Sequence, residues 1–175
     1  MQMDRGAFRV CTCRGCGVWR NSGSARGAWS FPTESGERVV GTNQVKPVKK
    51  IISTPAAPAA IGPYNQAVQV NGLLFVSGQI PIDPATGTLV AGEIEAETHQ
   101  VLRNIGAILA AAGSGYEQVV KASVFVKDMG HFSRINEVYA TYFPPETAPA
   151  RELVEVAQLP RFVNIEISVI ALAPA

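Results

Sequence analysis

One arginine and one glutamate near the C-terminus are the residues of this chain best suited to chemistry. Arg151 follows Pro149-Ala150, and Glu166 lies between two apolar residues in Ile165-Glu166-Ile167. An arginine presents a planar, permanently charged fork that binds a carboxylate through two parallel hydrogen bonds. A nearby glutamate can move protons to and from water. The two residues together predict a site that holds a small acid and hydrolyses it.

Two strands are expected to carry these side chains, at residues 151–157 and 163–172. Successive side chains point to opposite faces of a strand. In the second strand this alternation places the apolar residues on one face and Glu166 on the other. In the first strand, Arg151 and Leu153 share a face.

The preceding part of the sequence predicts two helices and four more strands. Strands are expected at residues 50–53, 67–70, 73–80 and 119–127, and amphipathic helices at residues 94–112 and 132–143. Asn71-Gly72 favours a tight hairpin turn, because both residue types tolerate positive backbone angles. In the strand at 119–127, Val120 is expected on the same face as Ala122, Val124 and Val126. The order βββαβαββ predicts an α+β fold with two helices on one face of a mixed sheet.

The sheet face that the helices leave uncovered should carry apolar side chains, among them Phe75 and Leu153. Such a face meets either water or another subunit, and a contiguous apolar surface favours the second. We therefore expect a homo-oligomer.

Composition divides the chain near Val48. Residues 1–47 hold six arginines and Lys46 against three acidic side chains, whereas residues 48–175 hold eight basic and eleven acidic side chains, a net charge of −3. The first segment is rich in Arg, Gly and Ser and contains no long apolar run, which is typical of a transit peptide for a chloroplast or mitochondrion. The alternatives are a disordered tail or an incorrect start, and without a signal the protein would stay in the cytosol.

Cysteine and histidine are too sparse in the body for a familiar metal centre. All three cysteines lie in Cys11-x-Cys13-x-x-Cys16, where no fourth cysteine or histidine completes a zinc site. After them only the imidazoles of His99 and His131 remain as nitrogen ligands, on different predicted helices. We expect neither a metal nor a cofactor, and interpret the three thiols as incidental to the leader.

Five ordered motifs of the body resemble the RidA family, also called YjgF/YER057c/UK114. They are Ile61-Gly62-Pro63-Tyr64, Val76-Ser77-Gly78-Gln79-Ile80-Pro81, Val124-Phe125-Val126-Lys127-Asp128, Pro149-Ala150-Arg151 and Ile165-Glu166-Ile167. The resemblance covers residues 49–173. It implies a chorismate-mutase-like fold and a homotrimer, whose sheets line a central barrel and whose active sites lie in clefts between subunits.

The resemblance also implies an activity, that of a 2-iminobutanoate/2-iminopropanoate deaminase. Such an enzyme hydrolyses reactive imines and enamines, including 2-aminoacrylate, to 2-keto acids and ammonia, and so protects pyridoxal-phosphate enzymes. An iminium carbon is already electrophilic, so hydrolysis requires a held substrate, a placed water and proton transfer, without a metal or a covalent nucleophile.

Residue by residue, the resemblance implies six site positions. Arg151 would bind the substrate carboxylate, Glu166 would position or activate water, and Tyr64 would close the cleft. The weaker assignments are Gly78 as a backbone contact, Asn136 as a polar neighbour of the site and Leu153 through its backbone carbonyl.

One departure from the family pattern concerns the pair after the arginine. Many members have Ser-Cys, Ser-Thr or Ala-Tyr there, whereas this chain has Glu152-Leu153, which predicts an apolar pocket wall and an altered substrate range. Taken without the resemblance, Arg151 and Glu166 would be solvated residues at the surface of two strands.

Two other functions remain open at the level of sequence. A non-catalytic member would use the same clefts to bind small carboxylates, as a regulator or chaperone-like partner. Some relatives are described as ribonucleases or translation inhibitors, but a body with a net charge of −3 and no basic stripe is poorly suited to a polyanion.

Overall fold

The computed structural model describes residues 48–90 and 92–174, and the predicted leader at residues 1–47 lies outside them. The strands are β1 (Lys50–Ile52), β2 (Ala67–Val70), β3 (Leu73–Gln79), β4 (Val119–Val126), β5 (Ala150–Glu155) and β6 (Ile165–Leu172); the helices are α1 (Ile94–Ala111) and α2 (Phe132–Ala140), with short 3₁₀ turns η1 (Tyr116–Gln118), η2 (Met129–His131) and η3 (Pro160–Phe162). The predicted order βββαβαββ is confirmed.

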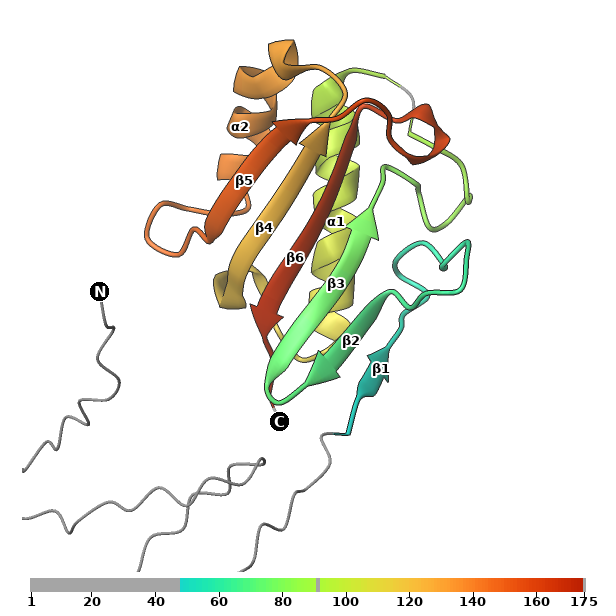
Figure 1. The fold of residues 1–175 in the computed structure, drawn as a ribbon, viewed down its shortest axis with the longest axis vertical. Helices are drawn as coiled ribbons and strands as arrows, with labels where there is room; N and C mark the ends of the chain where they lie inside the picture. The colour runs from blue at the N-terminus through green and yellow to red at the C-terminus, as the bar shows by residue number, and fades with distance from the viewer. Residues whose placement is uncertain (1–47, 91, 175) are drawn as a thin grey trace, which may run out of the picture. The chain divides into compact units, whose positions relative to one another are not determined.

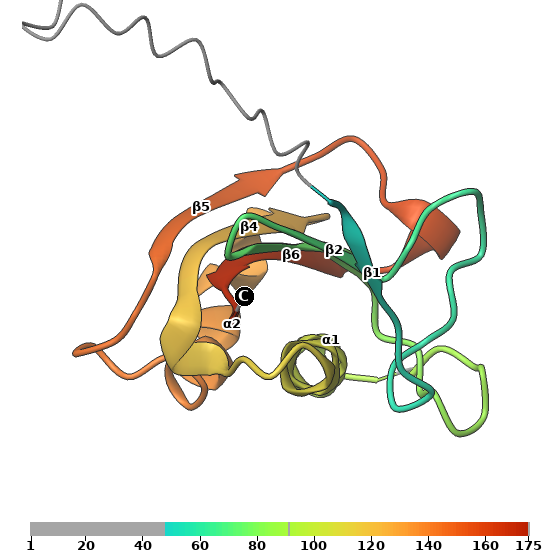
Figure 2. The same ribbon diagram turned by 90° about the horizontal axis from the view of Figure 1, so that it is seen from below.

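The six strands form one mixed sheet in the order β1-β2-β3-β6-β4-β5. All neighbours are antiparallel except β4 and β5, which run parallel and are joined through α2. Both helices lie on the same face of the sheet (Figures 1 and 2), as predicted. Strand β5 forms one edge of this sheet, so a side chain on β5 has a neighbouring strand on one side only.

The predicted hairpin joins β2 to β3. Val70 pairs with Leu73, and the two residues between them, Asn71 and Gly72, have φ angles of 50° and 75°. Positive φ at both central positions is the geometry that matches the twist of the flanking strands. Gly113, with φ 71°, likewise follows the end of α1 in the left-handed conformation.

The core lies between the sheet and the helices. On β6 the odd-numbered residues from Ile165 to Ala171 are buried, and Glu166 and Ser168 are only partly buried. Helix α1 contributes the apolar stripe predicted for it, which includes Val101, Leu102, Ile105, Ile108 and Leu109. The predicted alternation of β6 is therefore confirmed.

Two side chains lie elsewhere than the sequence predicted. Val120 is exposed rather than buried, because an irregularity between Val119 and Lys121 shifts the register of β4 against β6. Leu153 was expected on the uncovered face, but it pairs with the buried Val124 and packs against the core on the helix side.

The uncovered face carries large apolar side chains, as expected. Phe75, which is 41% exposed, forms a row with Ile51, Val68 and Ile170 across four strands. Val154 and Phe125 pair on the same face. Within residues 48–90 and 92–174, neither helix is long and apolar enough to cross a membrane.

Candidate active site

An open groove of about 590 Å³ holds three of the predicted site residues, Tyr64, Gly78 and Glu166. They come from the loop before β2, from the end of β3 and from the start of β6. The other residues that line the groove are Ile61, Gly62, Ser77, Ile80, Pro160 and Arg161. Its wall is mostly apolar, with Glu166 and Arg161 as the charged groups.

Glu166 lies directly on the backbone of Gly78. The pairing of β3 with β6 shifts register between Val76 and Gln79, so Gly78 belongs to an irregular stretch of strand. A Cβ atom at Gly78 would lie 2.8 Å from the carboxyl carbon of Glu166 and closer still to its Oε1. Glycine is therefore required here for the carboxylate to occupy its place against β3.

The environment of Glu166 favours its protonated form. Partial burial raises the pKa of its carboxyl above the ordinary value, because charge is poorly solvated there. Among residues 48–90 and 92–174 no side chain or backbone group forms a hydrogen bond or ion pair with this carboxylate. A carboxyl group with a raised pKa and free oxygens is suited to exchange protons with water or substrate.

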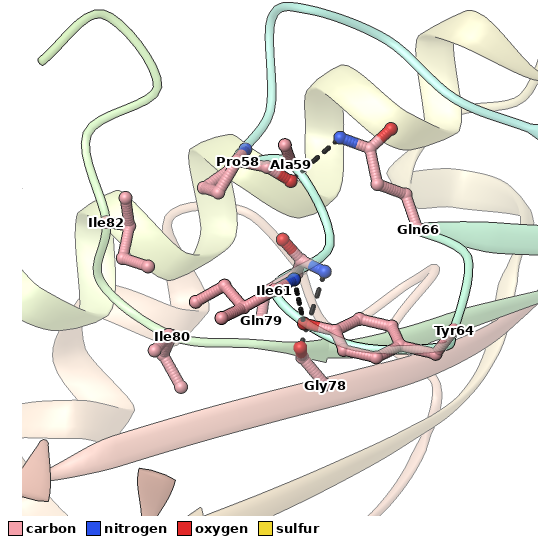
Figure 3. A pocket seen from close by; sticks show the side chains of 9 residues that line it. All are labelled: Pro58, Ala59, Ile61, Tyr64, Gln66, Gly78, Gln79, Ile80 and Ile82. Carbon is pink, nitrogen blue, oxygen red and sulfur yellow. Dashed lines mark hydrogen bonds between the residues drawn. The ribbon is translucent and has the colours of Figure 1, made fainter. Parts of the chain in front are cut away.

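Tyr64 is fixed beside Gly78 by its own loop. The amide of Tyr64 donates to the carbonyl of Gly62 at 2.8 Å, and its hydroxyl accepts from the amide of Ile61 at 3.3 Å. Figure 3 shows the tyrosine ring lying alongside Gly78, with its hydroxyl toward Ile61. The ring is half exposed, so it forms a wall of the groove that a further surface can reach.

The loop that carries Tyr64 is anchored by Gln66 and Ser77. The buried Gln66 amide donates to the carbonyls of Ala57 and Pro58 at 3.0 and 2.8 Å, and its oxygen accepts from the amide of Thr54. Ser77 Oγ donates to the carbonyl of Asn65 at 2.7 Å. The Gln66 bonds hold the two ends of the loop together, and the Ser77 bond attaches it to β3 next to Tyr64.

Arg151 lies on the other face of the sheet. It pairs with the buried Ala122 across the parallel β4–β5 ladder, so its side chain extends toward α2. Its guanidinium carbon lies over the ring of Tyr139, 4.6 Å from the centroid. In the described part of the chain its N–H groups make no hydrogen bond or ion pair. The fork is thus ordered by a ring and free to bind an anion.

Leu153 and Asn136 belong to this second group. Leu153 lies on the same face of β5 as Arg151, two residues further on. Asn136 is half-buried on α2, one turn before Tyr139, and residues three apart share a helix face. The structure therefore divides the six predicted residues into a groove set (Tyr64, Gly78, Glu166) and an edge set (Asn136, Arg151, Leu153).

Within one chain the two sets are on opposite sides of the sheet. Glu166 pairs with Phe125 on β4, whereas Arg151 pairs with Ala122, and odd and even positions of β4 face opposite ways. Arg151 and Glu166 of the same chain therefore do not come together in one site.

Sequence reasoning missed two residues near these sets. Tyr139, beneath Arg151, was interpreted only as an apolar position of an amphipathic helix. Arg161 lines the groove and has a φ angle of 55°; its place after Leu159-Pro160 in a turn was the available signal. Within the described residues, no three His, Cys, Asp or Glu side chains are grouped to hold a metal ion.

Comparison with known proteins places this arrangement in a family. The family model described as Endoribonuclease L-PSP matches residues 54–173. The chain belongs to this family, which is the YjgF/RidA family that its motifs resemble.

Similar proteins carry several names. A RutC family protein of Synechocystis is 52% identical over 71% of this chain and 97% of its own length. The 2-iminobutanoate/2-iminopropanoate deaminase of Mus musculus is 49% identical over 71% of this chain and 91% of its own. Reactive Intermediate Deaminase A, chloroplastic, of Arabidopsis thaliana is 46% identical over 70% of this chain and 65% of its own.

Solved structures share the fold. Escherichia coli TdcF with bound serine is 42% identical, covers 71% of this chain and 99% of its own, and superposes with a TM-score of 0.67. A member of this fold therefore binds a small amino acid. Three similar proteins, from Mus musculus, Bos taurus and Arabidopsis thaliana, are named as deaminases.

Proposed function

We propose that this protein is a 2-iminobutanoate/2-iminopropanoate deaminase. One observation carries the proposal: the carboxyl of Glu166, whose pKa is raised by burial and which has no partner within residues 48–90 and 92–174, lies on Gly78 in a groove walled by Tyr64. Relatives about half identical to this chain are named for that reaction.

The proposed reaction adds water to the C=N bond of a 2-imino acid. Arg151 binds the substrate carboxylate through its N–H groups. Glu166 takes a proton from water as the new C–O bond forms and returns a proton to nitrogen as the C–N bond breaks. The products are a 2-keto acid and ammonia, and no step draws on a metal or cofactor. Enamines such as 2-aminoacrylate enter the same route once protonated at carbon to the imine.

The remaining site residues would shape the pocket. Tyr64 would close over the substrate, and the backbone of Gly78 would contact it. On the other side, Asn136 and the carbonyl of Leu153 would meet the substrate's polar groups. The Leu153 side chain packs against the core, so we expect the residue to affect the site through its backbone.

A homotrimer with its sites between subunits would unite the two sets. The edge set of one chain would meet the groove set of the next, which supplies the contact that a single chain cannot make. The apolar side chains on the uncovered face, Phe75 and Val154 among them, support burial of that face in an assembly.

The physiological role would be protection of pyridoxal-phosphate enzymes from 2-aminoacrylate. The Arabidopsis relative is named chloroplastic. The basic, acid-poor composition of residues 1–47 supports import of this chain into an organelle as well.

A binding role without turnover is the second candidate, because a relative of the same fold is known with bound serine. It would use Arg151 to hold the carboxylate and leave Glu166 without a proton-transfer role. Catalysis of imine hydrolysis distinguishes the two candidates.

The direct test uses the purified full chain and 2-iminopropanoate generated in situ, with loss of the imine followed over time. We expect acceleration by the wild type and little by Arg151→Ala. Arg103→Ala, on the exposed side of α1, is the matched control and should keep full activity. Equal activity of Arg151→Ala and wild type would contradict the proposal that Arg151 binds the substrate carboxylate. Binding of the keto acid without turnover of the imine would favour the second candidate, the binding role.

A further inference from the structure

The contact between Arg151 and Tyr139 joins the edge strand β5 to helix α2. The guanidinium carbon lies 4.6 Å from the centroid of the tyrosine ring, and Tyr139 itself is only 7% exposed. A cation over an aromatic face is attracted by the negative charge of that face, most strongly where water is excluded. The ring therefore limits the directions that the Arg151 side chain can take.

The ring of Tyr139 is itself held by other aromatic side chains. It stacks on Phe143 with centroids 4.5 Å apart, and Phe143 meets Tyr116 edge-on at 5.4 Å. The hydroxyl of Tyr116 donates to the carbonyl of Leu102 on α1 at 2.7 Å. This aromatic cluster (Tyr116, Tyr139, Phe143) connects the ring beneath Arg151 to the core helix.

The hydroxyl of Tyr139 contributes little to this arrangement. It is buried and has no hydrogen-bond partner in the described part of the chain. Burial raises the pKa of Tyr139 to about 12, so the group stays neutral near pH 7. What Tyr139 offers Arg151 is consequently the face of its ring, which phenylalanine would also provide.

We propose that Tyr139 is a positioning residue that keeps the Arg151 fork turned toward the substrate carboxylate. This inference rests on the proposed function for the identity of the anion. Because one face of the guanidinium is occupied by the ring, its N–H donors stay free for two parallel hydrogen bonds to a carboxylate. Without the ring, the fork samples other directions and binding weakens.

The test compares Tyr139→Phe with Tyr139→Leu in the full chain. Two quantities are measured: the order parameter of the Arg151 Nε–Hε group by NMR, and KM and kcat for 2-iminopropanoate. In Tyr139→Leu we expect the order parameter to fall and KM to rise about fivefold, with kcat within about twofold of wild type. In Tyr139→Phe both quantities should stay close to wild type.

Each other outcome overturns the inference. An unchanged order parameter and KM in Tyr139→Leu would show that the ring does not position Arg151, and the same loss in Tyr139→Phe would assign the effect to the hydroxyl. Should the leucine variant not fold, Tyr139→Met is used, because methionine fills irregular gaps without an aromatic face. The NMR readout needs no turnover, so an inactive wild type would contradict the proposed function and leave this inference testable.

Discussion

Arg151 and Glu166 lie on opposite faces of one sheet, although both are on strands that flank β4. The arginine pairs with Ala122 and the glutamate with Phe125, positions of opposite parity. Under the proposed function, a small substrate that touches both residues would lie between two chains, at the edge of one sheet and the groove of another. This relationship links the proposed chemistry to the proposed assembly.

Gly78→Ala tests the place of Glu166. The new Cβ would occupy the position of the Glu166 carboxylate, which is the end of a flexible side chain and can move aside. We expect activity to fall by about two orders of magnitude, while the free energy of unfolding changes by less than about 1 kcal/mol. Kinetics and urea denaturation measure the two effects. A fully active Gly78→Ala enzyme would show that the observed place of Glu166 is not needed for catalysis.

The pH dependence of activity should report Glu166. Its pKa is raised by burial, so the proton-accepting carboxylate is lost as pH falls through a value above that of an ordinary glutamate. We expect kcat/KM to fall on the acid side with that pKa. The acid limb should disappear from the residual activity of Glu166→Gln. An acid limb that persists unchanged in Glu166→Gln would assign it to another group.

The raised pKa of Glu166 also predicts that its carboxylate, although needed for activity, destabilises the folded state near pH 7. Because the folded state raises the pKa, it disfavours the charged carboxylate, and this penalty is present at pH values above the folded pKa. It vanishes as pH falls below the unfolded value, where both states are protonated. Glu166→Gln should therefore be more stable than wild type near pH 7 and equal to it near pH 3, measured by urea denaturation at matched protein concentration. Destabilisation by Glu166→Gln at pH 7 would contradict it.

Glu97 should stabilise the start of β6. It is 5% exposed, near the start of α1, and accepts hydrogen bonds from Asn164 N at 3.2 Å and Asn164 Nδ2 at 2.7 Å. Glu97→Ala removes both and should cost about 2 kcal/mol in the free energy of unfolding. Glu137→Ala, an exposed position on α2, is the control and should cost less than about 0.5 kcal/mol. Equal losses in the two variants would refute the role given to Glu97.

The sequence predicted the elements and their order because the local signals were strong. The alternation of apolar residues on β6 predicts a strand, and the apolar stripe on α1 predicts a helix. Asn71-Gly72 predicts a hairpin turn, and none of the three patterns conflicts with the fold. Where β4 and β5 are concerned, strand periodicity alone did not suffice. The irregularity near Val120 and the pairing of Leu153 with Val124 depend on register between strands, which a single strand does not encode.

The candidate site was predictable as a set of residues but not as a geometry. Glu166 and Gly78 are far apart in sequence, and their contact follows from an irregular stretch of β3 that no composition rule marks. The division into an edge set and a groove set likewise depends on how β5 and β6 pair with β4, which decides the sheet face that each side chain takes. Tyr139 was visible as an apolar position of a helix, and only the folded chain shows the cation that it meets.

A mixed oligomer of Arg151→Ala and Glu166→Gln chains tests the central claim most directly. Each variant alone should be nearly inactive. If every site takes Arg151 from one chain and Glu166 from the next, random mixing at equal amounts leaves both residues intact in about a quarter of the sites. We therefore predict recovery of about a quarter of the wild-type activity. A mixed oligomer as inactive as its two parents would contradict a site shared between chains.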